Sequence, residues 1–121
     1  MGAKNYRELI VWQRAIELVK AIYKVSAGFP KEELYGIASQ IRRAAVSMPS
    51  NIAEGQARRT TGEFLHFLSQ AEGSLAEVDT QLILAVQLAF VTPEGTMQAS
   101  KLLVECQRML SALRTKLTTN H

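Results

Sequence analysis

A proline in the middle of a helical pattern constrains the fold of this chain more than any other feature. Residues 40–55 have the composition and periodicity of an α-helix, yet Pro49 lies among them. A proline inside a helix removes one backbone donor and clashes with the preceding turn, at a cost of about 3 kcal/mol. The apolar pattern continues past Pro49, from Ile41 to Ile52. It therefore predicts one kinked helix over residues 33–56 instead of two separate helices.

The polar residues around Pro49 have a structural explanation. We expect side chains near the proline to hydrogen-bond the backbone groups that the kink releases. We also expect an ion pair between Arg43 and Glu54, which project from similar sides of the helix. A small polar site at positions 50, 51 and 54 is the alternative. The residues to which we assign structural roles are Arg43, Ser47, Pro49, Ser50, Asn51, Glu54 and Gly55.

Three further segments carry apolar residues at the helical spacings of three and four. They cover residues 6–27, 61–91 and 93–117. Thr60 and Glu63 form a capping-box pattern before the second of these, and Thr92 with Pro93 suits the start of the third. Four amphipathic helices with short connections predict an all-α antiparallel up-down four-helix bundle. The length of 121 residues fits one domain, spanning residues 1–121.

Two of the predicted helices carry more apolar surface than one core contact needs. Residues 6–27 have a second apolar line beside the first, and the second half of residues 61–91 is also apolar on its back face. We therefore expect a homo-oligomer. The alternative is that the wide apolar faces are buried inside a thick monomer core. The expected interface residues are Val11, Leu18, Ile22, Leu84, Leu88 and Val91.

Paired arginines mark both ends of the kinked helix, at positions 42–43 and 58–59. The net charge of +3 permits an anionic partner without requiring one. Because clusters of basic side chains bind phosphate groups, we expect such side chains to contact nucleic acid. The candidates are Arg42, Arg58, Arg59, Lys20 and Lys24. The alternative is surface ion pairing, with partners among Glu54, Glu72, Glu77 and Asp79.

No residue pattern indicates catalysis, a metal or a cofactor. Glu63 and His66 match the Glu-x-x-His spacing of di-iron bundles, but such sites need two of these motifs. The other histidine is His121, and the capping box explains Glu63 better. Cys106 lies on the apolar line of residues 93–117, where cysteine packs as a small apolar residue. We expect no enzymatic activity and no bound cofactor or metal.

The cysteine content and the lengths of the apolar runs predict a location. One cysteine cannot form an intrachain disulfide, which favours a reducing compartment. The longest apolar segment, residues 82–91, is too short to span a bilayer. Lys4, Arg7 and Glu8 interrupt any apolar run that could act as a signal peptide. We expect a cytoplasmic protein that has no membrane contact.

Several short strings together resemble a known protein family. They are Leu9-x-x-Trp12, Phe29-Pro30, Glu33-Leu-Tyr-Gly36, Gln40-Ile-Arg-Arg-Ala44, Ser47-x-Pro-Ser-Asn-Ile-Ala-Glu-Gly55 and Ala71-Glu-Gly-Ser-Leu-x-Glu77. Over nearly the whole chain, they resemble the four-helix-bundle proteins named after the intervening sequences of bacterial 23S ribosomal RNA genes. Met48 stands where isoleucine is more usual in that family.

The resemblance implies a four-helix bundle that assembles as a ring-like pentamer. The accessory proteins of diversity-generating retroelements look similar; they are basic and pentameric, and they bind nucleic acid and a reverse transcriptase. By analogy, the resemblance implies a non-enzymatic scaffold that binds RNA or DNA, with RNA favoured. A scaffold that binds a protein partner and no nucleic acid is the alternative. The family has no defined catalytic residues that could be carried over to this chain.

Overall fold

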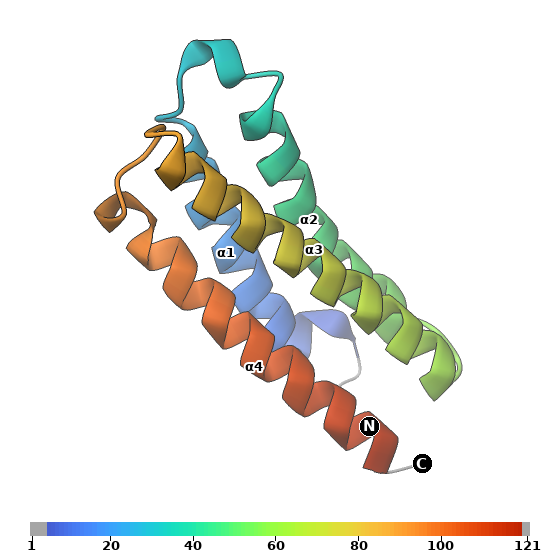
Figure 1. Cartoon of the computed structure of the whole chain (residues 1–121). Helices are drawn as coiled ribbons and strands as arrows, with labels where there is room; N and C mark the ends of the chain where they lie inside the picture. The colour runs from blue at the N-terminus through green and yellow to red at the C-terminus, as the bar shows by residue number, and fades with distance from the viewer. Residues whose placement is uncertain (1–4, 120–121) are drawn as a thin grey trace.

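Four long helices make up the protein, seen here in a computed structural model that describes residues 5–119. In chain order the elements are η1 (Tyr6–Glu8), α1 (Ile10–Ser26), η2 (Lys31–Glu33), α2 (Ile37–Gln56), α3 (Thr61–Gln87), η3 (Glu94–Thr96) and α4 (Met97–Thr119), where η denotes a short 3-10 helix. The described residues contain no strand, and the all-α bundle that the sequence predicts is confirmed. Figure 1 shows the chain reversing direction at each connection between the long helices. Lys4 and His121 lie outside the described residues.

Each long helix packs against two others around a shared core. α1 contacts α2 and α4, and α3 contacts the same two helices. All four contribute fully buried side chains at the spacings of three and four that the apolar pattern predicts, among them Leu18, Ile41, Leu68 and Leu110. The contact between α2 and α3 is the most extensive. No helix within residues 5–119 combines the length and apolar content needed to cross a membrane.

The core includes three residues that we expected at an oligomer interface. Val11, Leu18 and Ile22 are buried within the single chain, so this part of the prediction is wrong. Because α1 packs against both α2 and α4, both of its apolar lines are covered inside the bundle. The alternative of a wide monomer core is therefore right for α1.

Two of the remaining interface candidates lie on the surface. Leu84 and Leu88 are 44% and 56% exposed, and Ile83 beside them is exposed as well. Val91 packs against the core with part of its surface exposed. Self-association stays a prediction, and the apolar end of α3 is the part of the predicted interface that remains available for it.

α2 continues through Pro49 as one helix, as the periodicity predicts. Pro49 is buried and lines a small hollow together with Tyr6 and Trp12. The rings of Tyr6 and Trp12 pack edge to face, with centroids 5.3 Å apart. The segment before α1 therefore lies against the part of α2 that contains the proline. The kink itself stays a prediction.

Two side chains near Pro49 bond to carbonyls of the preceding turn. Ser50 Oγ donates to the Val46 carbonyl at 3.0 Å, and Asn51 Nδ2 donates to the Ser47 carbonyl at 2.9 Å. The bond that Pro49 cannot make belongs to the carbonyl four residues before it. The two side chains therefore support the neighbouring carbonyls of α2 and do not replace the missing bond.

The predicted ion pair between Arg43 and Glu54 is wrong. Arg43 Nη2 donates to Ser39 Oγ at 3.1 Å, and Glu54 pairs with Arg58 at 3.5 Å. Arg43 and Glu54 are about 16 Å apart along the axis at a rise of 1.5 Å per residue. Each interacts instead with a residue four positions away, the spacing that brings helical side chains together.

α3 ends at Gln87, earlier than the predicted end at residue 91. Ala89 adopts a left-handed φ of 61°. The Phe90 N–H bonds to the Ala85 carbonyl at 2.8 Å, and the Ala89 N–H bonds to the Val86 carbonyl at 3.0 Å. This is the pattern of a Schellman cap, which usually has glycine at the left-handed position. Alanine gives no such stop signal in the sequence.

Gly55 allows α2 and α3 to approach each other closely. It is buried near the end of α2, and a Cβ at this position would lie 2.8 Å from Phe67 Cβ and 2.9 Å from Phe64 Cδ1. Both phenylalanines belong to α3. Even the smallest side chain here would force the two helices apart or displace the aromatic rings.

Replacing Gly55 with alanine should lower the free energy of unfolding by roughly 1–3 kcal/mol, the usual cost of overpacking. The matched control is Gly73→Ala within α3, because a Cβ at Gly73 meets nothing within 4 Å. The control should raise the free energy of unfolding by about 0.5–1 kcal/mol. Urea denaturation followed by circular dichroism measures both. A Gly55→Ala protein as stable as the wild type would contradict the close packing.

Replacing Ala89 with glycine should raise the free energy of unfolding by roughly 0.5–1 kcal/mol. The left-handed conformation costs an alanine roughly 1–2 kcal/mol, and the greater freedom of glycine in the unfolded chain offsets about half of this. The same substitution at Ala112, an exposed position within α4, should lower stability by about 1 kcal/mol. Thermal unfolding of both variants tests the left-handed cap, which would be refuted if both lost stability.

Candidate nucleic-acid interface

The five basic residues expected to contact nucleic acid lie in two separate regions. Lys20 and Lys24 belong to the second half of α1, and Arg42 belongs to the first half of α2. This is the end of the bundle where η2 joins the two helices (Figure 1). Arg58 and Arg59 follow the opposite end of α2, and about 24 Å of helix axis separates Arg42 from Arg58. The five side chains therefore do not form one continuous site.

Arg42 is held against α1 by two contacts. Its Nε donates to Ser26 Oγ at 2.7 Å, and its guanidinium group lies over the Tyr23 ring, 4.8 Å from the ring centroid. Ser26 is buried and donates its own hydroxyl hydrogen to the Ile22 carbonyl at 2.7 Å. Neither contact of Arg42 uses its two Nη groups, which are suited to binding a phosphate oxygen.

Two tyrosines lie on the surface beside Arg42. Tyr35 is 93% exposed and Tyr23 is 45% exposed. The hollow between these side chains measures about 450 Å³ and is lined by Tyr23, Leu34, Tyr35, Ser39, Arg42, Arg43 and Val46. We call these seven residues the tyrosine–arginine surface. It places aromatic rings and guanidinium groups around one depression.

Arg43 reaches this surface from the next position of α2. Its Nη2 donates to Ser39 Oγ at 3.1 Å, so the residue to which we assigned a structural ion pair belongs to the candidate interface instead. Neither tyrosine is among the site residues predicted from the sequence. Tyr23 continues an apolar line of α1, and only the fold shows that it is partly exposed, unlike the buried residues of that helix. For Tyr35, the sequence signal of a surface role was an aromatic residue in the short turn before α2.

At the other end of α2, Arg58 is engaged within the bundle. Its Nη2 lies 3.5 Å from Glu54 Oε2, and its guanidinium group lies over the Phe67 ring, 4.7 Å from the centroid. Arg59 is exposed in the turn before α3. Because an exposed ion pair contributes little energy, Arg58 remains able to exchange Glu54 for another anion. Of the two arginines that follow α2, Arg58 is the one with an aromatic partner.

The two lysines of α1 differ in their surroundings. Lys20 Nζ lies 3.4 Å from Glu17 Oε2, and both side chains are exposed. Lys24 lines a separate hollow that includes Val91 and Glu94, on the side of α1 that faces the start of α4. Lys20 lies three residues before Tyr23 on α1, a spacing that makes the two side chains neighbours, so it remains a candidate beside the tyrosine–arginine surface. Lys24 lies beside a different part of the bundle.

A family model for the 23S rRNA-intervening sequence protein matches residues 7–112. The chain belongs to this family. The match extends from η1 into α4, and it includes the tyrosine–arginine surface and both arginines that follow α2. A comparison with curated proteins gave no match. The family assignment made from the sequence strings is thus confirmed.

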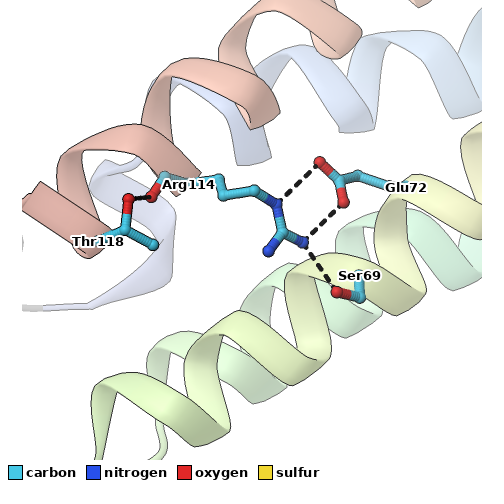
Figure 2. Close-up of polar contacts among 4 residues, drawn as sticks. All are labelled: Ser69, Glu72, Arg114 and Thr118. Atoms are coloured by element: carbon cyan, nitrogen blue, oxygen red, sulfur yellow. Dashed lines mark hydrogen bonds and ion pairs between the residues drawn. The ribbon is translucent and has the colours of Figure 1, made fainter.

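A bidentate ion pair joins α3 to α4 in this member of the family. Figure 2 shows Arg114 of α4 reaching toward Glu72 and Ser69 of α3. Arg114 Nη2 lies 2.7 Å from Glu72 Oε1 and donates to Ser69 Oγ at 2.8 Å, and Nε lies 3.3 Å from Glu72 Oε2. A fork of parallel bonds fixes both partners. Arg114 therefore has a packing role and is not a candidate for contacting nucleic acid.

The Glu-x-x-His spacing does not coincide with a cluster of metal ligands. Thr60 Oγ1 accepts a hydrogen bond from the Glu63 N–H at 3.1 Å and donates to the Glu63 carboxylate at 3.0 Å, so the predicted cap at the start of α3 is confirmed. His66 Nε2 lies 3.1 Å from Gln70 Nε2. Between residues 5 and 119, no group of three or more His, Cys, Asp or Glu side chains could hold a metal ion.

Cys106 lies in the core, as its place on the apolar line predicts. The pKa of its thiol is raised to about 11, chiefly by burial and also by the nearby Glu105 carboxylate, whereas Arg14 acts in the opposite direction. Because the thiolate is the reactive form of cysteine, the folded environment makes this side chain inert near neutral pH.

Iodoacetamide at pH 8 should leave Cys106 unmodified in the folded protein and modify it readily in urea. The fold favours the neutral thiol. Its contribution to stability is therefore complete below the ordinary pKa of 9.0 and is lost as the pH rises toward about 11. Over this range, urea unfolding should show a steeper loss of stability for the wild type than for Cys106→Ala. Equal slopes for the two proteins would rule out the raised pKa.

Proposed function

We propose that this 23S rRNA-intervening sequence protein is a non-enzymatic RNA-binding protein that holds an unpaired RNA segment on the tyrosine–arginine surface. The observation that carries the proposal is Tyr35, which is 93% exposed beside Arg42 and Arg43. Unpaired bases stack on exposed aromatic rings, with about 1–3 kcal/mol per base. An arginine beside such a ring can bind the phosphate that follows the stacked base.

The preorganisation of Arg42 supports this proposal. Its Nε bond to Ser26 and its position over Tyr23 already restrict the side chain. Less conformational entropy is then lost when the Nη groups bind a phosphate. Arg43 adds a second guanidinium group at the same hollow. Lys20 of α1 is a peripheral contact for RNA that extends beyond the hollow. Arg58 and Arg59 provide a second, independent contact for another part of the RNA.

RNA is the favoured nucleic acid because the surface is built for stacking. Sequence-specific proteins mainly recognise RNA in loops, bulges and ends, where bases are unstacked and accessible to aromatic side chains. A net charge of +3 is too small for tight binding through phosphate contacts alone. Stacking must therefore supply a large share of the affinity. A cytoplasmic location, which the single cysteine favours, fits such a partner.

The proposal includes self-association, with a pentamer as the form that the family resemblance suggests. The exposed apolar side chains Ile83, Leu84 and Leu88 at the end of α3 support it, because contiguous apolar surface marks association sites. Several copies of a weak site bind one RNA far more tightly than a single copy does. This would compensate for the small number of basic residues in each chain.

Tyr35→Ala should weaken binding of a fluorescently labelled single-stranded RNA by about 10-fold or more, which is the loss expected from one stacked base. The ring is almost fully exposed, so its removal should leave the thermal midpoint of unfolding unchanged. Arg43→Gln should weaken binding several-fold and reduce the salt slope of log affinity by about 0.7, the value for one phosphate on a single strand. Fluorescence anisotropy across a salt series measures both effects.

Arg108→Gln is the matched control for Arg43→Gln, because it removes the same charge from an exposed position of α4. It should leave the affinity and the salt slope unchanged. Replacing Arg59 tests the second contact, with a smaller loss of affinity expected. If RNA binding is absent at low salt, or if Tyr35→Ala binds as tightly as the wild type, the proposal is wrong and the protein-binding scaffold becomes the better account.

A further inference from the structure

A groove of about 700 Å³ runs between the first half of α2 and the second half of α3. Four of its polar lining residues are Glu33 and Gln40 on one side, and Glu77 and Gln81 on the other. Ile37 and Leu84 are among its apolar walls. No basic residue lines it, so two carboxylates dominate its charge. The groove belongs to a different face of α2 from the tyrosine–arginine surface.

The Gln81 side chain has an acceptor without a donor. Gln81 is only 7% exposed, and its buried Oε1 accepts no hydrogen bond within the described chain. Its Nε2 donates to Gln40 Oε1 across a long 3.4 Å. A buried acceptor that lacks a donor costs about 1–3 kcal/mol. A donor that enters the groove and displaces this weak amide contact would remove that cost.

The carboxylates of the groove are also available for a donor. Within residues 5–119, Glu77 forms no ion pair. Glu33 Oε1 accepts a weak hydrogen bond of 3.5 Å from the Ile37 N–H at the start of α2. A Cβ on Gly36 would lie 2.7 Å from this oxygen, so the glycine leaves the space that the carboxylate occupies. Glu33 Oε2 is not used by that bond.

We propose that the α2–α3 groove binds an alkyl guanidinium group, the chemistry of an arginine side chain. A guanidinium carries one positive charge and five N–H donors in a planar fork. These match acceptors of residues on both walls: the carboxylates of Glu33 and Glu77, and Gln81 Oε1, which is buried and is reached when Gln81 releases Gln40. The methylene stem of such a ligand packs on Ile37 and Leu84. A phosphate or carboxylate would instead meet two negative charges.

The start of α2 opposes a cation, but weakly. A helix N-terminus carries roughly half a positive charge, whereas the two carboxylates contribute two negative charges. Glu33 lies directly over this helix end. Arg43 lines the adjoining hollow together with Gln40 and Glu77, and it adds one positive charge at that edge. The helix end and Arg43 together still carry less charge than the two carboxylates, so the balance around the groove remains negative and favours a cation.

The groove unites residues from strings that are separate in the sequence. Glu33 and Gly36 precede α2, Gln40 begins the string that ends at Ala44, and Gly73 with Glu77 belongs to α3. The proposed RNA-binding function uses none of these residues. The two proposals can therefore succeed or fail separately.

The test uses N-acetyl-arginine amide as the probe and N-acetyl-citrulline amide as its uncharged control. In ¹H–¹⁵N NMR titrations of the full chain, the arginine probe should shift the Gln81 side-chain amide and the Leu84 backbone amide, with Kd on the order of 1 mM. The citrulline probe should not. Absent shifts up to about ten times that concentration, or equal shifts with both probes, would overturn the proposal.

Charge-matched variants locate the site. Glu77→Gln should weaken binding of the arginine probe by about 10-fold, the effect of removing one charge-assisted hydrogen bond. Asp79→Asn makes the same charge change on the same helix outside the groove and should leave the affinity unchanged. Equal loss in both variants would show only a general charge effect and would refute the site.

Gln81→Met provides an independent measurement. It removes the oxygen that lacks a donor while keeping a similar volume, so it should raise the thermal midpoint of unfolding and weaken probe binding. A lower midpoint with unchanged probe affinity would overturn the role assigned to Gln81. A readout of stability is thus available alongside the readout of binding.

Light scattering distinguishes the source of the guanidinium group. If an arginine of a second copy occupies the groove, Glu77→Gln and saturating arginine probe should both lower the mass of the assembly. If the group comes from a separate molecule, the mass should stay constant while the NMR shifts persist. Either result supports a guanidinium site, whereas a mass that falls equally with the citrulline probe argues against it.

Discussion

The close approach of α2 and α3 is the constraint on which the rest of the protein depends. Gly55 sets it at one end, because a Cβ there would overlap the side chains of Phe64 and Phe67. Farther along, Ser74 donates to Ser47 across the helix pair at 3.0 Å. Toward the start of α2 the contact becomes polar and opens into the groove lined by Gln40 and Gln81. Tight and loose packing thus occur along a single helix pair, and the loose end is the one that can take a ligand.

Periodicity in the sequence predicted the helices and the core well, because apolar residues at spacings of three and four form a stripe that a helix usually turns toward the core. It did not predict what covers each face. Val11, Leu18 and Ile22 were assigned to an oligomer, yet neighbouring helices of the same chain bury them. Viewed down the helix axis, Arg43 and Glu54 project from similar sides. Such a view gives the angle between two side chains but not their distance along the axis, and this distance keeps them apart. The end of α3 was missed because Ala89 takes a left-handed conformation that sequence patterns associate with glycine.

Three arginines make packing contacts within the chain. Arg42 lies over Tyr23, Arg58 lies over Phe67, and Arg114 forms the bidentate bridge in Figure 2. A basic composition therefore overstates the charge that is available to a partner. The candidate interface was found in the structure and not in the sequence because its tyrosines become significant only beside these fixed guanidinium groups. Charge marked the segments that carry the candidate interface, and the exposure of the tyrosines distinguished one of them.

Four consecutive residues of the turn between α1 and α2 line two different surfaces. Leu34 and Tyr35 face the tyrosine–arginine surface, whereas Glu33 and Gly36 line the groove beside α3. Surface turns usually accept an inserted or deleted residue with little effect. Here, a change of one residue in length would alter which side chains face each surface, and would disturb both together. This short connection is therefore as restricted in length as the helices that it joins.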